Sequence, residues 1–122
     1  MASKVAIITG AARGIGLACA RRFLADDYRV VLADRDEHAV GEALDSLDSD
    51  RSRVLAVQCD VSDALSVHNL VAETLSQFGR IDVLINNAGI ALKGGALDLS
   101  VADFDQVLAV NLRGAFLLSK AV

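Results

Sequence analysis

The stretch Val5–Gly16, VAIITGAARGIG, joins a short aliphatic run to three closely spaced glycines. The run Val5–Ile8 is rich in β-branched residues, and this pattern predicts a strand that is buried on both faces. Beyond it, Ile15, Cys19 and Phe23 recur at helical spacing, which predicts a helix. The glycines therefore lie in a turn between a buried strand and a helix.

A turn of this kind creates a site that favours an anion. The free N–H groups and the positive dipole end of the helix point to one place, and glycine lets a phosphate approach the backbone closely. The spacing is G-x-x-x-G-x-G rather than G-x-G-x-x-G, and no Lys-Ser or Lys-Thr follows the last glycine, as a P-loop requires. The alternative is a tight turn whose glycines serve packing alone.

A second strand, residues 29–33, ends at Asp34, which lies 18 residues after Gly16. At a spacing of about 20 residues, an acidic side chain meets the adenosine ribose of NAD. A carboxylate accepts hydrogen bonds from both ribose hydroxyls and repels a 2′-phosphate. Asp34 could instead start a loop or cap the next helix, but Asp36 can serve as that cap and leave Asp34 free.

Strand and helix patterns alternate along the whole chain. Strands are expected at 5–9, 29–33, 53–59 and 81–85, and helices at 14–26, 36–47, from Ser62 as N-cap to Gly79, and from a capping box at Ser100 and Asp103. Four such units predict an α/β fold with a parallel sheet and helices on both faces.

Composition narrows the class of protein. With 122 residues we expect one domain over 1–122, and 53% apolar residues suit a sheet covered on both faces. A net charge of −4 argues against nucleic acid as a partner, and no apolar run approaches the ~20 residues of a membrane span. The chain enters its first strand at once, which predicts no signal peptide. Cys19 and Cys59 predict neither a disulfide framework nor a metal site, so we expect a reducing cytoplasm.

Small and polar residues follow the strands. In open α/β sheets ligands bind at the carboxyl ends of the strands, so these residues are expected to share one rim. Asp60 and Val61 could bond and flank an adenine, Asn87 could bond a ribose, and Gly89 allows close backbone approach. For Asn86 an amide that ties adjacent strands together is at least as good an interpretation.

The last helix carries one polar residue on its predicted inner stripe, which comprises Phe104, Val107, Leu108, Leu112 and Ala115. Asn111 falls on that stripe. A buried amide needs partners, so Asn111 is either a satisfied structural residue or part of a site, and the sequence leaves both open.

In order and spacing, these motifs resemble the short-chain dehydrogenase/reductase family: Thr9–Gly16, Asp34, Asp60–Val61, Asn86–Gly89 and Asn111. The resemblance runs the full length of the chain. It implies a Rossmann-type three-layer α/β/α fold with strand order 3-2-1-4. It also implies hydride transfer between NAD or NADP and an alcohol or carbonyl carbon.

The resemblance assigns roles to individual residues. The glycine turn would cradle the pyrophosphate, Asp34 would hold the ribose, and the later strand ends would meet the adenine and line the cleft. The cofactor-binding residues it implies are Gly10, Arg13, Gly14, Ile15, Gly16, Asp34, Asp60, Val61, Asn87 and Gly89. Asn111 would match the asparagine of the catalytic tetrad, whose helix distortion helps to order the active-site lysine.

The rest of the tetrad is missing. The family has a serine after a fifth strand and a Tyr-x-x-x-Lys on the fifth helix, whereas the single tyrosine here, Tyr28, precedes the second strand and is followed four residues on by Leu32. Ser119 and Lys120 lie in a helix and do not substitute. We therefore expect the cofactor-binding portion of such an enzyme, ending before the catalytic serine and the Tyr-x-x-x-Lys.

Two functional hypotheses follow, together with a third from another class. The chain belongs to an NAD-dependent oxidoreductase, or it is an inactive module that binds dinucleotide or a partner chain. We expect the inactive module for the 122 residues by themselves and the oxidoreductase for the protein from which they come. A phosphoacceptor signalling domain also has an Asp after strand three, but it needs an acidic cluster where this chain has TGAARGIG.

The cofactor and the assembly can also be predicted. Asp34 favours NAD over NADP, although Arg13 and Arg35 stand where NADP-preferring relatives place basic residues. We expect a homo-oligomer, because the strand at 81–85 would be an apolar edge and the last helix is apolar on more than one face.

Overall fold

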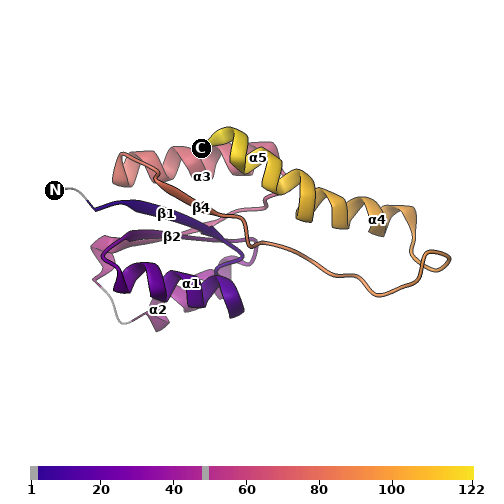
Figure 1. The fold of residues 1–122 in the computed structure, drawn as a ribbon, viewed down its shortest axis with the longest axis horizontal. Coiled ribbons are helices and arrows are strands. Elements are labelled where there is room, and N and C mark those ends of the chain that lie inside the picture. The colour runs from indigo at the N-terminus through magenta and orange to yellow at the C-terminus, as the bar shows by residue number, and fades with distance from the viewer. Residues whose placement is uncertain (1–2, 48–49) are drawn as a thin grey trace.

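The computed structural model describes residues 3–47 and 50–122. Its sheet has four parallel strands, β1 (Val5–Thr9), β2 (Arg29–Asp34), β3 (Val54–Gln58) and β4 (Val83–Ile85). The strand order is β3-β2-β1-β4, and helices cover both faces (Figure 1). The predicted three-layer α/β fold and its strand order are thus confirmed.

Helices fill the connections between the strands. They are α1 (Gly14–Ala25), α2 (Glu37–Ser46) and α3 (Ala64–Phe78), with a short 3-10 helix, η1 (Arg51–Arg53), before β3. The last helix, residues 101–121, consists of α4 (Val101–Leu108), a π-helical turn η2 (Ala109–Arg113) and α5 (Gly114–Ala121). Among the described residues, no helix is long and apolar enough to cross a membrane.

The core lies on both faces of β1, whose five residues are all buried. Val5 and Ile7 pack in one cluster with side chains of α3 and α5, and Ile8 packs in another with α1 and α2. Successive strand residues point to opposite faces, so a strand covered on both sides must be apolar throughout. This is why the uninterrupted aliphatic run decides the fold.

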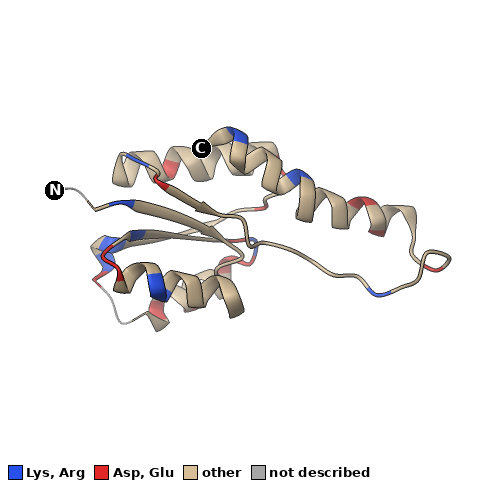
Figure 2. Cartoon of the chain, in the orientation of Figure 1, with Lys and Arg blue, Asp and Glu red and all other residues tan. Residues whose placement is uncertain are grey.

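The register of the sheet fixes where the strands end. Ile7 of β1 lies opposite Val31 of β2 on one side and Leu84 of β4 on the other. The segments that follow these strands therefore emerge at one edge. Charged residues gather at strand ends and helix surfaces, and the middle of the strands lacks them (Figure 2).

The ends of the helices agree with the sequence except at one place. Asp36 and Ser100 cap α2 and α4 by accepting the N–H groups of Ala39 and Asp103, and Gly79 ends α3 in the left-handed conformation. The prediction that Ser62 caps α3 is wrong, because Asp63 caps it. The Ser62 hydroxyl instead donates to the Asp60 carboxylate at 2.7 Å.

The predicted inner stripe of the last helix is also wrong. Phe104, Leu108 and Leu112 are 52%, 42% and 67% exposed, whereas Val110, Gly114 and Leu118 are buried. Two features account for this. Beside the sheet, α5 packs on α3, but α4 projects beyond the sheet and has no layer to pack against (Figure 1). The π turn also shifts the phase of the apolar stripe.

Candidate functional site

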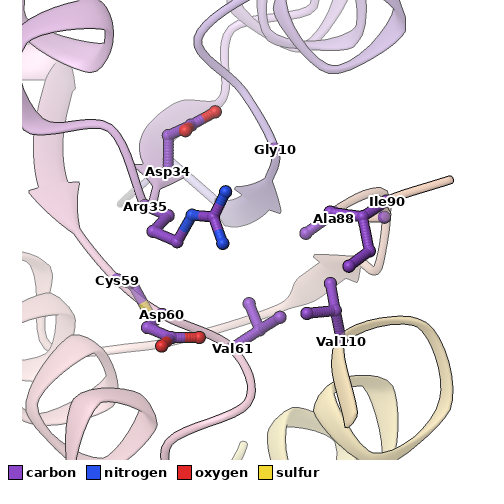
Figure 3. Close-up of a pocket in the computed structure, with 10 residues that line it drawn as sticks. Gly10, Asp34, Arg35, Cys59, Asp60, Val61, Ala88, Ile90 and Val110 are labelled. Atoms are coloured by element: carbon purple, nitrogen blue, oxygen red, sulfur yellow. The ribbon is translucent and has the colours of Figure 1, made fainter. Parts of the chain in front are cut away.

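Two adjoining cavities, of about 120 and 410 Å³, open at the carboxyl edge of the sheet. Each is lined by segments that follow different strands, and the last helix adds Val110 to the smaller one (Figure 3). Both are lined by Gly10, Asp34, Arg35, Ala88 and Gly89. The sequence-predicted rim is therefore one contiguous hollow.

At Gly10 and Gly16 the glycine turn is packed so tightly that a side chain is excluded. A Cβ on Gly16 would collide with the carbonyl oxygen of Gly10 and stand 2.7 Å from Asn87 Nδ2. Gly10 has φ +61°, and a Cβ there would lie 3.0 Å from Ala88 Cα. By contrast, Gly14 has φ +57° and open space where its Cβ would be. The turn thus presses against the segment after β4 on one side and is open on the other.

The beginning of α1 differs from those of α2, α3 and α4. Its N-cap position, Arg13, makes no side-chain cap hydrogen bond. The other three helices are capped by Asp36, Asp63 and Ser100. Because the first N–H groups of a helix have no partner within it, the start of α1 retains donors that an anion can satisfy. Beside it, Ile15 is 76% exposed and lines the larger cavity.

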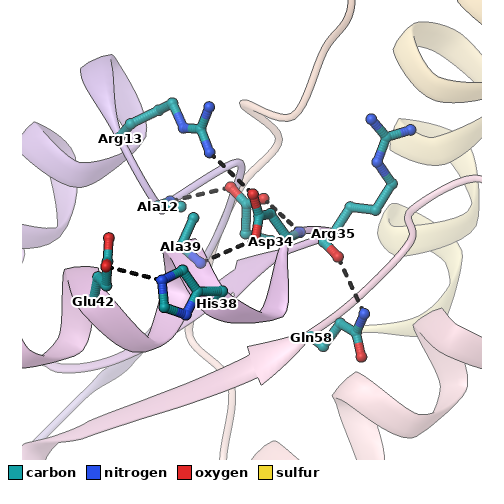
Figure 4. Close-up of polar contacts among 9 residues, drawn as sticks. Ala12, Arg13, Asp34, Arg35, His38, Ala39, Glu42 and Gln58 are labelled. Atoms are coloured by element: carbon teal, nitrogen blue, oxygen red, sulfur yellow. Dashed lines mark hydrogen bonds and ion pairs between the residues drawn. The ribbon is translucent and has the colours of Figure 1, made fainter.

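Asp34 holds the turn and the start of α2 together. Its Oδ2 accepts the Ala12 N–H at 3.1 Å (Figure 4). Its Oδ1 accepts the Asp36 N–H at 3.0 Å. Asp36 caps α2 as predicted, which leaves Asp34 free of that role, but two backbone N–H groups use part of the acceptor capacity of Asp34. A carboxylate has about four acceptor sites, so each oxygen retains capacity for a second donor on the cavity side.

Asn87 ties β1 to the segment after β4. Its Nδ2 donates to the carbonyl oxygens of Thr9 and Gly10 at 3.1 and 3.2 Å. For Asn86 this strand-tying role was one of the two interpretations left open, but Asn86 is exposed and donates to Ser119 Oγ at 3.3 Å instead. Asn87 also lines the larger cavity, where its amide stands beside the glycine turn.

Asp60 and Val61 form the far wall of the smaller cavity. Asp60 Oδ1 accepts both the N–H and the hydroxyl of Ser62, at 3.0 and 2.7 Å, which fixes the carboxylate. Val61 is 6% exposed and packs so closely on Gly114 that a Cβ there would stand 2.7 Å from Val61 Cγ2. Cys59 is buried beside them, and burial raises the pKa of its thiol.

Asn111 joins the last helix to the segment after β4. Its Oδ1 accepts the Ile90 N–H and its Nδ2 donates to the Ile90 carbonyl oxygen, both at 2.8 Å. It lies in the π turn, and a Cβ on Gly89 would stand 3.3 Å from its Oδ1. The amide thus has partners although the residue is exposed, and the helix around it is distorted.

Sequence reasoning missed the part that Thr9 plays. Its buried hydroxyl accepts the N–H groups of Asn87 and Ala88 at 3.1 and 3.0 Å and donates to the Ile85 carbonyl oxygen at 3.3 Å. A hydroxyl on an otherwise apolar buried strand needs partners, and this signal was available in the sequence. Gly114 was also missed, because its role depends on contact with Val61, which is distant in sequence.

The only tyrosine lies far from these cavities along the sheet. Tyr28 precedes β2 and packs edge-to-face on Phe23 with ring centroids 4.9 Å apart. It is therefore at the amino end of β2, whereas Asp34 and the cavities are at the carboxyl end. Within residues 3–47 and 50–122, no group of three or more His, Cys, Asp and Glu side chains is placed to hold a metal ion.

Comparison with known proteins identifies the origin of this arrangement. The sequence profile of the short chain dehydrogenases matches residues 4–122. The chain is 42% identical over 118 residues to meso-2,3-butanediol dehydrogenase of Serratia marcescens, covering 97% of this chain and 46% of the relative. It is 46% identical over 124 residues to 2-(R)-hydroxypropyl-CoM dehydrogenase of Xanthobacter autotrophicus, covering 98% and 50%. The chain thus spans about half the length of these relatives.

Solved structures share the same fold. A 3-ketoacyl-(acyl-carrier-protein) reductase from Brucella melitensis, complexed with NADH, matches with a TM-score of 0.90 and 37% identity over 98% of this chain and 48% of its own. A short-chain dehydrogenase/reductase from Burkholderia phymatum, in complex with NAD, matches with a TM-score of 0.93 and 35% identity over 98% and 43%. This chain belongs to the short-chain dehydrogenase/reductase family of oxidoreductases.

Proposed function

We propose that this chain is the dinucleotide-binding domain of an NAD-dependent oxidoreductase that moves hydride between nicotinamide and an alcohol or carbonyl carbon. One observation carries the proposal. The uncapped start of α1 and the Asp34 carboxylate, at the ends of adjacent strands, face one contiguous hollow. The first suits a pyrophosphate and the second suits the two hydroxyls of a ribose.

The local chemistry fits the parts of a dinucleotide. Gly10, Arg13, Gly14, Ile15 and Gly16 would hold the pyrophosphate, with Gly14 leaving room beside the backbone. Asp60 and Val61 would bond and flank the adenine in the smaller cavity, and Asn87 and Gly89 would line the path toward the nicotinamide. When bound, the nicotinamide ring supplies the hydride acceptor or donor.

We propose NAD rather than NADP as the cofactor. A 2′-phosphate beside Asp34 would meet a carboxylate whose position is fixed by two backbone N–H groups. The negative charges of the carboxylate and the phosphate repel each other, and such a repulsion can make a protein prefer one of two ligands. That two structural relatives hold NADH and NAD supports the same choice.

The 122-residue chain is expected to bind cofactor without turning over substrate. Asn111 is the one residue of the family's catalytic set that the sequence matches, and Tyr28 lies at the other end of the sheet. A missing general acid/base alone forfeits roughly 10²–10⁴-fold in rate. The competing hypothesis is an inactive dinucleotide-binding or interaction module. Under that hypothesis the complete polypeptide also turns over no substrate.

Direct titration tests this proposal. NAD and NADP are titrated by calorimetry into the 122-residue chain and into the complete polypeptide wherever the coding sequence continues. We expect tighter binding of NAD, and turnover of small alcohols or carbonyl compounds only where a Tyr-x-x-x-Lys is present. Tighter binding of NADP would overturn the cofactor assignment, and binding of neither would overturn the function. Cofactor binding by a complete polypeptide that turns over none of the substrates offered would favour the inactive module.

We also propose that a second copy of the chain covers the outer face of the last helix. Leu108, Leu112 and Phe116 are 42%, 67% and 62% exposed and line one broad surface hollow together with Asp105 and Arg113. The two charges flank Ala109, so an antiparallel copy would place each charge against its opposite. An exposed apolar stripe of this length is typical of an interface.

We also propose that the protein works in the cytoplasm. Cys19 and Cys59 are both free thiols, the first half-buried and the second buried. Free thiols persist where glutathione and thioredoxin keep cysteines reduced. The free thiols therefore support a cytoplasmic location. We expect a dinucleotide and a small alcohol or carbonyl compound as the ligands there.

A further inference from the structure

The π turn Ala109–Arg113 separates the smaller cavity from the outer face of the last helix. On its inner side Val110 is buried and lines the smaller cavity (Figure 3). On its outer side Ala109, Leu112 and Arg113 line the broad surface hollow where a second copy is proposed to bind. Five consecutive residues therefore border both the proposed adenine site and the proposed interface.

Three contacts attach this turn to the walls of the smaller cavity. Val110 packs in the same buried cluster as Val61, which also lines that cavity. Asn111 holds the backbone of Ile90, another lining residue, by two hydrogen bonds of 2.8 Å. Just after the turn, Gly114 fits so closely on Val61 that a Cβ there would also stand 3.1 Å from the Val61 carbonyl oxygen. A molecule in the smaller cavity would therefore contact side chains that are joined directly to the turn.

The outer side of the same turn is exposed. Leu112 is 67% exposed, and with Phe116 it lines a hollow of about 620 Å³. The Gly114 N–H bonds to the Ala109 carbonyl oxygen five residues back, which is the hydrogen bond of a π turn. Such turns are rare in helices and are frequent at functional sites. In a single chain this unusual turn is held from its inner side and is open to a partner on its outer side.

From this geometry we infer that the π turn couples the two sites: an adenine nucleotide in the smaller cavity tightens self-association across the outer face, and self-association tightens nucleotide binding. This inference rests on the proposed dinucleotide site and the proposed contact with a second copy, and it adds a link between them. The nucleotide and the second copy restrict the same five residues from opposite sides. Once one of them has restricted the turn, binding of the other loses less conformational entropy, so the coupling is positive.

Thermodynamic linkage fixes the relative size of the two effects. A dimer has two smaller cavities, so the gain in dimer affinity at saturating nucleotide equals the square of the gain in nucleotide affinity at each cavity. We expect 5′-AMP, which carries the adenine but no nicotinamide, to bind about threefold more tightly to the dimer than to the monomer. The dimer should then form about tenfold more tightly in saturating 5′-AMP.

Two measurements on the 122-residue chain test both directions of the coupling. Sedimentation equilibrium with and without 5′-AMP gives the dimer affinity, and equilibrium dialysis at protein concentrations below and above the dimer dissociation constant gives the nucleotide affinity. Leu112→Ser removes an apolar side chain from the outer face. This variant should bind 5′-AMP with one affinity at every protein concentration, equal to that of the wild-type monomer.

Val110→Ala tests the turn as the route of the coupling. It shortens the side chain that connects the turn to the smaller cavity, so the tenfold gain in dimer affinity should fall below about threefold. Val67→Ala is the matched control, since Val67 is buried in the same cluster but does not line the smaller cavity. Both variants remove the same buried atoms and lose stability, but Val67→Ala should keep the full gain.

Each outcome supports or overturns a distinct part of the proposal. A dimer affinity that 5′-AMP weakens, or changes by less than about twofold, would overturn the coupling, and the proposed function would stand because 5′-AMP is bound. An equal loss of the gain in Val110→Ala and Val67→Ala would overturn the turn as its route. A chain that stays monomeric with and without nucleotide would overturn the interface and the coupling together. A chain that binds neither NAD nor 5′-AMP would overturn the proposed function as well.

Discussion

The charged residues at the two ends of the sheet differ in their surroundings. At the amino end, Arg80 makes two hydrogen bonds to Asp82, and Asp82 accepts the Val5 N–H at 2.8 Å. Arg29 there donates to the Ser3 carbonyl oxygen at 2.9 Å and lies over the Phe78 ring. At the carboxyl end, Asp34 and Arg35 border a hollow instead.

We infer that the charges at the amino end hold the fold, whereas Asp34 at the carboxyl end braces the turn and also meets the ligand of the proposed site. Both ends contain arginines and aspartates close together, so the presence of charge does not distinguish them. What distinguishes them is where the hydrogen-bonding capacity points. The hydrogen bonds of Arg80, Asp82 and Arg29 at the amino end go to backbone and neighbouring side chains, whereas at the carboxyl end part of the hydrogen-bonding capacity of Asp34 faces the cavities. Substitutions at the two ends should therefore separate stability from binding.

The largest effect is expected from Gly16→Ala at the carboxyl end. The new Cβ would collide with the Gly10 carbonyl oxygen, so the turn and the start of α1 must move. Overpacking of this kind costs about 1–3 kcal/mol of unfolding free energy, and NAD affinity should fall by more than about tenfold. Calorimetry and urea unfolding give the two values.

Gly41→Ala provides the matched control for that experiment. Gly41 is also a helical glycine, but nothing lies within 4 Å of where its Cβ would be. Alanine should therefore raise the unfolding free energy by roughly 0.5–1 kcal/mol and leave NAD binding unchanged. If the two variants behaved alike, the close packing of the turn would not be what makes Gly16 necessary.

Asp34→Ala should have the next largest effect. It removes the carboxylate from the ribose end and leaves Arg13 and Arg35 in place. We expect NAD affinity to fall on the order of tenfold and the preference for NAD over NADP to narrow, as two hydrogen bonds to a charged acceptor are lost. Titration of both cofactors measures the ratio. A preference as strong as that of the wild type would rule out Asp34 as its source.

Asp82→Asn should change stability at the amino end without changing binding. Its hydrogen bonds with Arg80, and then with the Val5 N–H, hold the pKa of Asp82 below its usual range. A depressed folded pKa adds stability that is present above the unfolded value, near 3.9, and lost as pH falls through the folded value. The variant should therefore be less stable at pH 7, and the difference should shrink by pH 3.

Urea unfolding at both pH values checks this prediction. Asp45→Asn is the control, because Asp45 also pairs with an arginine but its side chain is 72% exposed, against 22% for Asp82. Its effect should be smaller at both pH values. NAD affinity of Asp82→Asn should equal that of the wild type, and a loss of affinity would show that the two ends are not independent.

The smallest effect on the fold is expected at the outer face of the last helix. Leu112→Ser should lower the mass measured by light scattering at micromolar concentration, and the unfolding free energy of the dissociated chain should move by less than about 0.5 kcal/mol. Leu65→Ser is the control, since Leu65 on α3 is 65% exposed and Leu112 67%. A wild-type chain that is a monodisperse monomer would contradict the interface.

Local patterns predicted the parts of this molecule that depend on local physics. The aliphatic run of β1, the glycine turn and the caps at Asp36 and Ser100 follow from burial and backbone geometry within a few residues. The strand order followed from the family resemblance. The Asp34 position beside the turn followed from the rule that strand ends share one edge.

What the sequence did not predict depends on long-range packing. Whether Asn86 or Asn87 reaches the Thr9 carbonyl oxygen is set by the register between β1 and β4, and the sequence pattern does not contain it. The buried face of the last helix depends on where the sheet ends and on the π turn at Ala109–Arg113. Asp63 rather than Ser62 caps α3, because the helix begins at Ala64, and the Ser62 hydroxyl donates to Asp60 instead.

Hydrogen exchange with and without NAD tests the contrast between the two ends most directly. We predict that NAD slows exchange of backbone amides in residues 10–16, 34–36 and 86–90, which border the cavities, and leaves residues 3–5 and 78–82 unchanged. Equal protection at both ends, or protection confined to the amino end, would contradict the assignment of the carboxyl end as the cofactor site.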